Sequence, residues 1–157
     1  MTGSDPILDI RDLTVEFDSE DGPLRAVDEV SFQIRRGEIV GLVGESGVGK
    51  SRTSEAILGL IRRPPGRVAG EVRFGGRDLL ALDEAALARI RGKDIAMIFQ
   101  NPSASLNPVF RVGDQMLEAM ALHLPEPRST LKERVVETLG RVGISSPRTR
   151  ARDYPHQ

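Results

Sequence analysis

The sequence predicts an α/β fold in which short buried strands are followed by helices. Residues 7–17 alternate between apolar and polar side chains and are rich in β-branched residues, as expected of a half-buried strand. The run EIVGLV at residues 38–43 is almost wholly apolar, as in strands that a parallel sheet buries on both faces. A glycine-rich stretch follows, and residues 51–61 then have a helical apolar stripe. That stripe comprises Ala56, Ile57, Leu60 and Ile61.

The other elements of the N-terminal part follow in order. Residues 18–24 are predicted to form a turn, and residues 26–34 the antiparallel strand that returns from it. Residues 62–70 are expected to be a loop, and residues 70–80 a short strand and turn. Asp83 can then cap a short helix, which Gly92 would end.

The C-terminal part is predicted to begin with a second buried strand, IAMIF, at residues 95–99. A polar loop with serines and prolines follows it, and two amphipathic helices come after the loop. The first carries the stripe Val112, Met116, Met120 and Leu124 and stops at Pro125. The second is expected to open with a capping box of Thr130 and Glu133 and to end before Gly143. Its apolar positions are Leu131, Val135, Leu139 and Val142.

Composition excludes several classes of function. The 157 residues are 39% hydrophobic and 29% charged, which is typical of globular proteins. A formal net charge of −1 gives no electrostatic case for binding nucleic acid. There is no cysteine, and the two histidines, His123 and His156, do not have metal-ligand spacing. No signal peptide or membrane-spanning run is apparent, so we expect a soluble, cytoplasmic protein.

Residues 44–51, GESGVGKS, match the phosphate-binding loop pattern G-x-x-x-x-G-K-[ST]. Triphosphate oxygens need several converging backbone N–H groups, and glycines let the main chain approach that closely. The helix that follows points its positive end at the same anion. Lys50 is expected to pair with the β- and γ-phosphates, and the Ser51 hydroxyl to ligate Mg²⁺. The candidate nucleotide-binding residues are Gly44, Glu45, Ser46, Gly47, Val48, Gly49, Lys50, Ser51 and the adjoining Arg52.

The loop alone does not distinguish GTPases, kinases and ATPases, but the order of elements around it is more specific. A strand ending in an aromatic residue, an antiparallel return, the phosphate loop and a buried strand ending in Gln100 resemble the nucleotide-binding domain of an ABC transporter. The resemblance implies a P-loop NTPase fold with a RecA-like core, an antiparallel β subdomain and the start of a helical subdomain. It implies that residues 1–100 contain the antiparallel β subdomain and the phosphate-loop part of the core. Residues 101–157 would contain the Q-loop and an incomplete helical subdomain.

Gln100 matches the Q-loop glutamine of that family. Its amide has both a donor and an acceptor, so the resemblance implies a catalytic role in which it contacts Mg²⁺ or the attacking water. The stretch FQNPSASLNPVFRVGDQ is similar to the same region of the ATP-binding subunits of dipeptide, oligopeptide and nickel importers. GESGVGKS, GEVRFGGRDLL and the closing YPHQ resemble the same branch.

This resemblance implies that the chain binds ATP and Mg²⁺ as the energy-coupling subunit of an importer. In the complete protein, ATP hydrolysis would drive uptake of peptides or similar small solutes. Phe17 matches the aromatic residue that stacks on adenine, and Val27 a residue that lines the same pocket, although Phe17 could also be an ordinary core residue. The implied partners are membrane permease subunits, a second ATP-binding subunit in a homo- or heterodimer and, indirectly, a solute-binding protein. The implied location is peripheral, on the cytoplasmic side of the cell membrane.

Residues 1–157 correspond to the N-terminal half of such a subunit. They do not contain the family's signature run, its Walker B strand ending in Asp-Glu, or its switch histidine. We therefore expect these residues alone to bind ATP but to hydrolyse it negligibly. We also expect the runs at 38–43 and 95–99 to expose unpaired backbone and apolar side chains, which would make the isolated chain marginally stable.

Two alternatives remain open at this point. One is a soluble ABC protein that serves translation or DNA repair. Tight, salt-sensitive nucleic-acid binding would support that alternative. The other is a non-catalytic nucleotide-binding module whose partner is another subunit.

Overall fold

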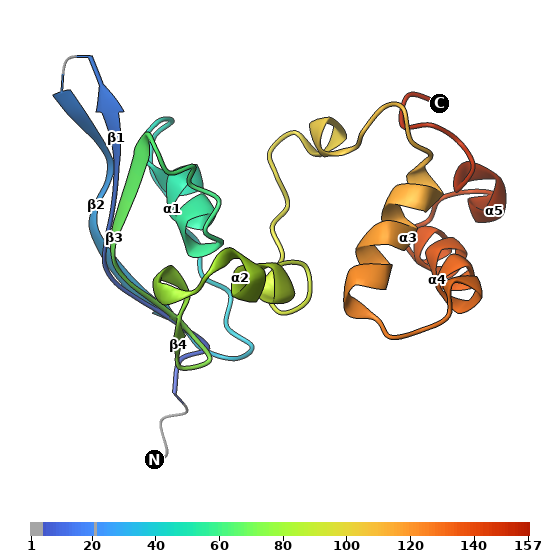
Figure 1. Ribbon diagram of the computed structural model, residues 1–157, viewed down its shortest axis with the longest axis horizontal. Coiled ribbons are helices and arrows are strands. Elements are labelled where there is room, and N and C mark those ends of the chain that lie inside the picture. The colour runs from blue at the N-terminus through green and yellow to red at the C-terminus, as the bar shows by residue number, and fades with distance from the viewer. Residues whose placement is uncertain (1–4, 21) are drawn as a thin grey trace. The chain divides into compact units, whose positions relative to one another are not determined.

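The structure, a computed structural model, describes residues 5–20 and 22–157, apart from the side chains of Ser103 and Ala104. It consists of two compact units, Met1–Arg91 and Gly92–Gln157, each described by itself below (Figure 1). Within the described ranges, no helix is long and apolar enough to cross a membrane.

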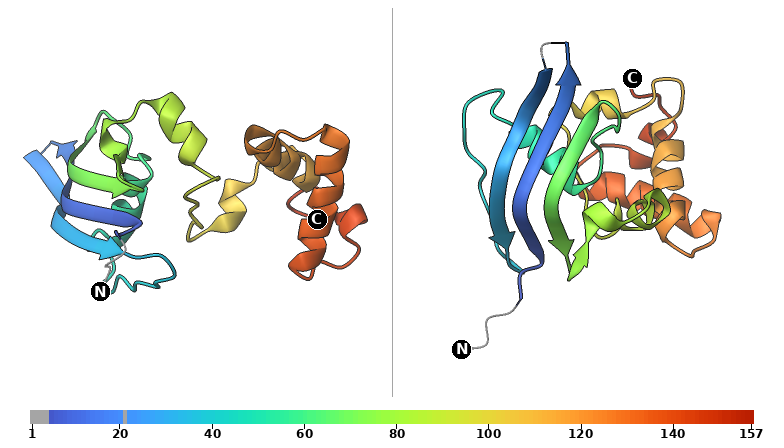
Figure 2. Two further views of the ribbon diagram at one scale, coloured as in Figure 1. Left: turned by 90° about the horizontal axis from the view of Figure 1, so that it is seen from below. Right: turned by 60° about the vertical axis from the view of Figure 1, so that its left-hand side comes forward.

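The first unit is built on a four-stranded antiparallel sheet. Its strands are β1 (Leu8–Ser19), β2 (Gly22–Ile34), β3 (Gly66–Phe74) and β4 (Arg77–Asp78), in the spatial order β2-β1-β3-β4 (Figure 2). β1 lies between two neighbours, so that Leu8 faces Ile34 on one side and Phe74 on the other. The predicted strand at 7–17 and its return at 26–34 are confirmed. β3 begins at Gly66 rather than at Gly70, because residues 66–69 of the predicted loop pair with residues 14–17 of β1.

The apolar side chains of β1 lie on one face of this sheet. Ile10, Leu13 and Val15 are almost completely buried, and α1 (Lys50–Ile57) packs against β1 and β2. Simple alternation would place residues 10 and 13 on opposite faces. A register shift between them, with Asp12 at a φ of +49°, inserts one extra residue and turns both inward.

A short 3-10 helix, η1 (Leu79–Ala81), and α2 (Glu84–Ile90) complete the first unit. α2 starts where predicted, because Asp83 Oδ1 accepts a hydrogen bond from the Ala86 N–H at 2.7 Å. Arg91 then fastens the end of α2 to the chain that leaves α1. Its Nε donates to the Leu58 carbonyl at 2.7 Å and its Nη2 to the Gly59 carbonyl at 3.0 Å.

α1 is shorter than the helix predicted over residues 51–61. It ends at Ile57, and the chain turns at Gly59, whose φ is +63°. Ala56 and Ile61 of the predicted stripe are buried, but Leu60 is 40% exposed. The turn breaks the helical period, so the last apolar residues no longer share one face.

The two apolar runs predicted to be buried strands do not form strands. Residues 38–43 have no regular secondary structure, and Ile39 and Val43 are more than 90% exposed. In residues 95–99 only Ile95 forms an isolated bridge, and Ile98 is 90% exposed. A strand exists only through hydrogen bonds to a neighbour, and the described residues pair no strand with either run. The expected exposure of apolar side chains is therefore confirmed, whereas the strands themselves are not.

The second unit is helical. It contains the short 3-10 helix η2 (Pro102–Ser105), α3 (Val112–His123), α4 (Arg128–Arg141) and α5 (Pro147–Arg150). Leu117 of α3 packs with Leu131, Val135 and Leu139 of α4 to form its core. Met116, Met120, Leu124 and Ala151 pack against this core from its edges. The predicted stripes are thus confirmed except at two positions: Val112 is not among the residues of this core, and Val142 is 71% exposed beyond the end of α4. The stripe predicted for α3 also missed Leu117, which is the buried residue of that helix.

The capping box predicted at Thr130 and Glu133 is wrong. α4 begins at Arg128, with Pro127 at its N-cap position and no side-chain cap, so Thr130 already lies inside the helix. Pro127 sets the boundary because its ring fixes φ at a value that a helix start tolerates. The Glu133 carboxylate pairs instead with Arg148 of α5, at 2.6 Å from Nη2. The predicted end is correct, since Gly143 follows the helix with a φ of +83°.

Candidate nucleotide-binding site

The phosphate-loop sequence joins residues 38–43 to α1, and its glycines are required by the backbone. Gly47 and Gly49 have φ values of +88° and +92°, which side chains with a β-carbon rarely adopt. A β-carbon added to Gly49 would lie 2.1 Å from the carbonyl oxygen of Ala26. The loop is therefore pressed against β2 at the point where α1 begins. A β-carbon on Gly44 would lie 2.9 Å from the Val48 side chain, so the loop also closes on itself.

The Lys50 side chain crosses this loop. Its Nζ donates to the Gly44 carbonyl at 2.7 Å and also to the Glu45 carbonyl. The ammonium is thus held by main-chain oxygens at the mouth of the loop, without a carboxylate partner among the described ion pairs. A cation held by neutral acceptors keeps its charge available for an incoming anion.

The first turn of α1 is fixed by Thr53, a residue that the sequence analysis did not single out. Thr53 is buried, its N–H donates to the Gly49 carbonyl at 2.9 Å, and its hydroxyl donates to the same oxygen at 3.1 Å. Such back-bonding to the residue four positions earlier is common for threonine in helices. It orients the carbonyl of Gly49 down the helix and leaves the N–H groups of the first turn facing the loop. Ser51, the predicted Mg²⁺ ligand, is exposed in that turn.

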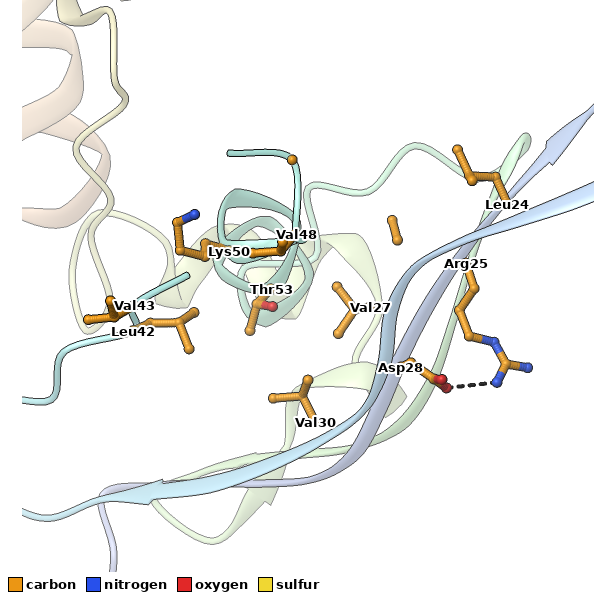
Figure 3. A pocket seen from close by; sticks show the side chains of 12 residues that line it. Leu24, Arg25, Val27, Asp28, Val30, Leu42, Val43, Val48, Lys50 and Thr53 are labelled. Carbon is orange, nitrogen blue, oxygen red and sulfur yellow. Dashed lines mark hydrogen bonds and ion pairs between the residues drawn. The ribbon is translucent and has the colours of Figure 1, made fainter. Parts of the chain in front are cut away.

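A cavity of about 490 Å³ lies beside the loop (Figure 3). Four segments of the chain line it: residues 24–28 and Val30 of β2, Leu42 and Val43, Gly47 and Val48 of the loop, and Lys50 and Thr53 of α1. Four predicted site residues therefore share one cavity: Val27, Gly47, Val48 and Lys50. In Figure 3 Val27 points toward the cavity from β2, across from α1.

The electrostatic character of the β2 wall is set by Arg25. Its Nη1 lies 2.7 Å from Asp28 Oδ1 and its Nε lies 3.0 Å from Glu16 Oε1. Hydrogen bonds to Asp28 and then to Glu16 raise the pKa of Arg25 above its usual value. Because this arginine is already neutralised by two carboxylates, Lys50 is the lining cation that a phosphate would meet.

Phe17 does not line the cavity but is connected to the loop through Arg52. The Arg52 guanidinium carbon lies 5.1 Å from the centre of the Phe17 ring, in a cation–π contact. Glu55 holds the guanidinium in place at 2.6 Å. Phe17 is half-buried at the end of β1, opposite Leu24. The structure thus brings Phe17 to Arg52, which is two residues beyond Lys50.

The remaining predicted residues are exposed. No hydrogen bond or ion pair is described for the side chains of Glu45 and Ser46. These two residues therefore contribute to the loop through their backbone. Gln100 is exposed in the second unit. The described residues contain no cluster of three His, Cys, Asp or Glu side chains that could hold a metal ion.

Comparison with known proteins identifies the family. A family model described as ABC transporter matches residues 27–157, which include the phosphate loop, α1 and the whole second unit. The chain belongs to the ABC transporter family.

Two curated relatives from this family are close in sequence. The dipeptide transport ATP-binding protein DppD of Haemophilus influenzae is 46% identical over 152 residues, which are 96% of this chain and 46% of that protein. The oligopeptide transport ATP-binding protein OppD of Bacillus subtilis is 43% identical over 152 residues, covering 96% and 42%. The chain therefore spans slightly less than half the length of these ABC proteins.

Solved structures share the fold. The dimeric ABC transporter cassette MJ0796 aligns with a TM-score of 0.80 at 22% identity, over 96% of this chain and 62% of that one. A structure of the same cassette bound to ADP and Pi aligns with a TM-score of 0.78 at 21% identity. The predicted α/β P-loop fold of an ABC cassette is thus confirmed, although the two buried strands are not formed.

Proposed function

We propose that this chain binds ATP as part of the energy-coupling subunit of an importer for peptides or similar small solutes. The observation that carries the proposal is the phosphate loop. The backbone of the loop contacts β2 at Gly49, and the Lys50 ammonium donates to uncharged carbonyl oxygens of the same loop. The identity of 46% to a dipeptide transport ATP-binding protein supports the solute class.

The residues present fit ATP with Mg²⁺. Backbone N–H groups of residues 44–51 and the Lys50 ammonium would hold the phosphates, and the Ser51 hydroxyl would ligate Mg²⁺. Phe17 and Val27 would receive the adenine, since an aromatic face stacks on a base whatever its substituents. ATP, when hydrolysed in the complete protein, would supply the free energy for uptake. Arg52 lies over the Phe17 ring, so its guanidinium would have to move aside for adenine to stack on that face.

The second unit would transmit the nucleotide state. Gln100 would contact Mg²⁺ or the attacking water, and the polar loop after it would lead to the surface that meets a permease subunit. This assignment divides the chain near residue 100, into a nucleotide-binding part and the start of a helical subdomain. The partners would be permease subunits, a second ATP-binding subunit and, indirectly, a solute-binding protein. The subunit would be peripheral, on the cytoplasmic side of the membrane.

Uptake of a radiolabelled dipeptide tests this function in cells that express the complete subunit with its permease. We expect Lys50→Ala to abolish uptake, because it removes the cation of the phosphate loop. Lys93→Ala is the matched control, since Lys93 is exposed in the second unit and should leave uptake unchanged. Undiminished uptake by Lys50→Ala would contradict the proposal, as would ATP-dependent uptake of an unrelated solute class alone.

A further inference from the structure

The polar loop that follows residues 95–99 ends in a closed turn at Asn107–Phe110. The Asn107 side-chain oxygen accepts from the Val109 N–H at 3.1 Å, and the Phe110 N–H donates to the Asn107 carbonyl at 3.3 Å. These two bonds make Asn107 the base of the turn, and Pro108 occupies its first corner. The turn lies outside regular secondary structure, so it depends on such local bonds for its shape.

One side chain fastens this turn to α3. Gln115 lies in the first turn of α3, and its Oε1 accepts from the Asn107 N–H at 2.8 Å. Its Nε2 donates to the Asn107 carbonyl at 3.0 Å and to the Phe110 carbonyl at 3.0 Å. A single amide therefore satisfies one donor and two acceptors and bridges the two ends of the turn. A side-chain amide can do this because it carries two N–H donors and a carbonyl acceptor on one neutral group.

The start of α3 is itself anchored from the other side. The Val112 N–H donates to the Asp153 carbonyl at 3.0 Å and the Gly113 N–H to the Ala151 carbonyl at 2.8 Å. A β-carbon on Gly113 would lie 2.5 Å from the Ala151 oxygen, so the two segments are in close contact. Gln115 thus connects the turn to a helix end that cannot shift freely.

The fastened turn presents apolar side chains to solvent. Val109 is 70% exposed and Phe110 is 56% exposed, and Leu106 just before the turn is 37% exposed. Apolar residues that gather on one exposed segment are typical of a surface that contacts a partner. The hydrogen bonds to Gln115 hold the turn in the conformation in which these side chains are exposed.

We propose that Gln115 is a positioning residue for coupling. It holds the turn Asn107–Phe110 in one conformation, so that Val109 and Phe110 are presented to the permease subunit. This inference rests on the proposed function, in which the segment after Gln100 meets the permease. It adds the residue on which the shape of that contact depends.

The first half of the test is local and uses amide hydrogen exchange by NMR on the 157-residue chain. Gln115→Leu removes the only side-chain acceptor described for the Asn107 N–H. We expect the Asn107 amide to exchange at least about tenfold faster, corresponding to the loss of roughly one net hydrogen bond. Glu118→Gln, one turn further along the exposed side of α3, is the matched control and should leave Asn107 protected. Unchanged exchange at Asn107 in Gln115→Leu would overturn the inference.

Exchange of the α3 amides shows whether the variant has kept its fold. Should Gln115→Leu lose α3, Gln115→Ala repeats the test with the residue that has the highest helix propensity. Asn107 exposed with α3 intact supports the role of Gln115 in holding the turn.

The second half measures function in the complete importer reconstituted in vesicles. We expect Gln115→Leu to lower peptide-stimulated ATP turnover and peptide uptake together, while the affinity for a fluorescent ATP analogue stays unchanged. Glu118→Gln should match the natural subunit in all three measurements. Loss of Asn107 protection with normal uptake would overturn the positioning role. Failure of the proposed function would look different, because Lys50→Ala would then leave nucleotide affinity unchanged.

Discussion

Position 49 accepts only a residue without a β-carbon, for two separable reasons. Its φ of +92° disfavours any side chain, and an added β-carbon would lie 2.1 Å from the Ala26 carbonyl oxygen. Gly76 offers a matched control, because its φ is +82° and a β-carbon there meets open space. We expect Gly76→Ala to lower the free energy of unfolding by about 1 kcal/mol and Gly49→Ala by clearly more. Urea unfolding would measure both, and equal losses would show that the loop is not pressed on β2.

Phe17 yields a prediction about nucleotide affinity. Its half-buried ring lies under the Arg52 guanidinium, at the edge of the phosphate-loop region. We expect Phe17→Ala to weaken ATP binding by about 1–3 kcal/mol, the usual contribution of a base stacked on an aromatic ring. Phe17→Tyr keeps the aromatic face and should bind with nearly natural affinity. Equal weakening by both substitutions, in an equilibrium titration, would assign Phe17 to the core instead.

At the residue scale the sequence predicted a glycine-rich loop before α1, and Gly47 and Gly49 have the positive φ values that such a loop requires. Its role in binding phosphate stays a prediction. It did not predict Thr53, although a hydroxyl four residues after Gly49 is a recognisable back-bonding pattern. The contact between Gly49 and Ala26 could not be predicted, since it depends on how β2 and the loop meet in three dimensions. The same holds for Gln115, whose partners lie outside any helix or strand.

The pairing of β1 with β2 depends partly on Asp9, which is buried on the polar side of the sheet. Arg11 donates to its carboxylate at 2.6 Å, and Gln33 of β2 donates at 3.0 Å. The hydrogen bond from Arg11 is the largest cause that lowers the pKa of Asp9, and the hydrogen bond from Gln33 lowers it further. Together they hold this pKa below its ordinary value, although burial acts in the opposite direction. A carboxyl whose pKa is lower in the folded state stabilises the fold above its unfolded pKa. That stabilisation is lost as the pH falls through the folded pKa.

We therefore expect the melting temperature of the chain to fall below about pH 4 more steeply than that of Asp9→Asn. The asparagine cannot be protonated, so its contribution does not change over that range. Asp94→Asn, at an exposed position, serves as the control and should follow the natural chain. Thermal unfolding between pH 3 and pH 7 measures the difference. Parallel curves for the natural chain and Asp9→Asn would contradict the role given to this carboxylate.

The helical unit depends on the contact between α3 and α4. Leu131 is 1% exposed and packs against Leu117, Val135 and Leu139. We expect Leu131→Ala to destabilise this unit by about 2–5 kcal/mol, through lost burial and the cavity that remains. Leu122→Ala removes the same atoms at a position that is 75% exposed and should change stability by less than about 0.5 kcal/mol. Similar losses in chemical unfolding would show that this core does not hold the unit together.

At the scale of elements, periodicity predicted the strands β1 and β2 and the helices α2, α3 and α4. It was wrong for residues 38–43 and 95–99, because an apolar run indicates that a segment is suited to burial but not which neighbour buries it. It also misplaced the start of α4. The Thr130–Glu133 pattern matched a capping box, but Pro127 begins the helix earlier and Arg148 binds the glutamate.

At the scale of the whole molecule, the chain combines a phosphate loop with apolar segments that no described strand covers. Ile39, Val43 and Ile98 are each at least 90% exposed. Exposed apolar segments of this kind are typical of a surface that another part of the protein or a partner covers. The loop, by contrast, is held by contacts within the first unit, through Gly49, Lys50 and Thr53. We therefore expect this chain to bind nucleotide even when no partner covers its exposed apolar segments.

Calorimetric titration of ATP with Mg²⁺ into the 157-residue chain tests the central claim most directly. We predict saturable binding that Lys50→Ala weakens at least about tenfold, because a phosphate loses one charge-assisted bond worth roughly 1.5–3 kcal/mol. Lys93→Ala should bind as the natural chain does. Absence of saturable binding, or equal affinity in Lys50→Ala, would contradict the assignment of residues 44–51 as the nucleotide site.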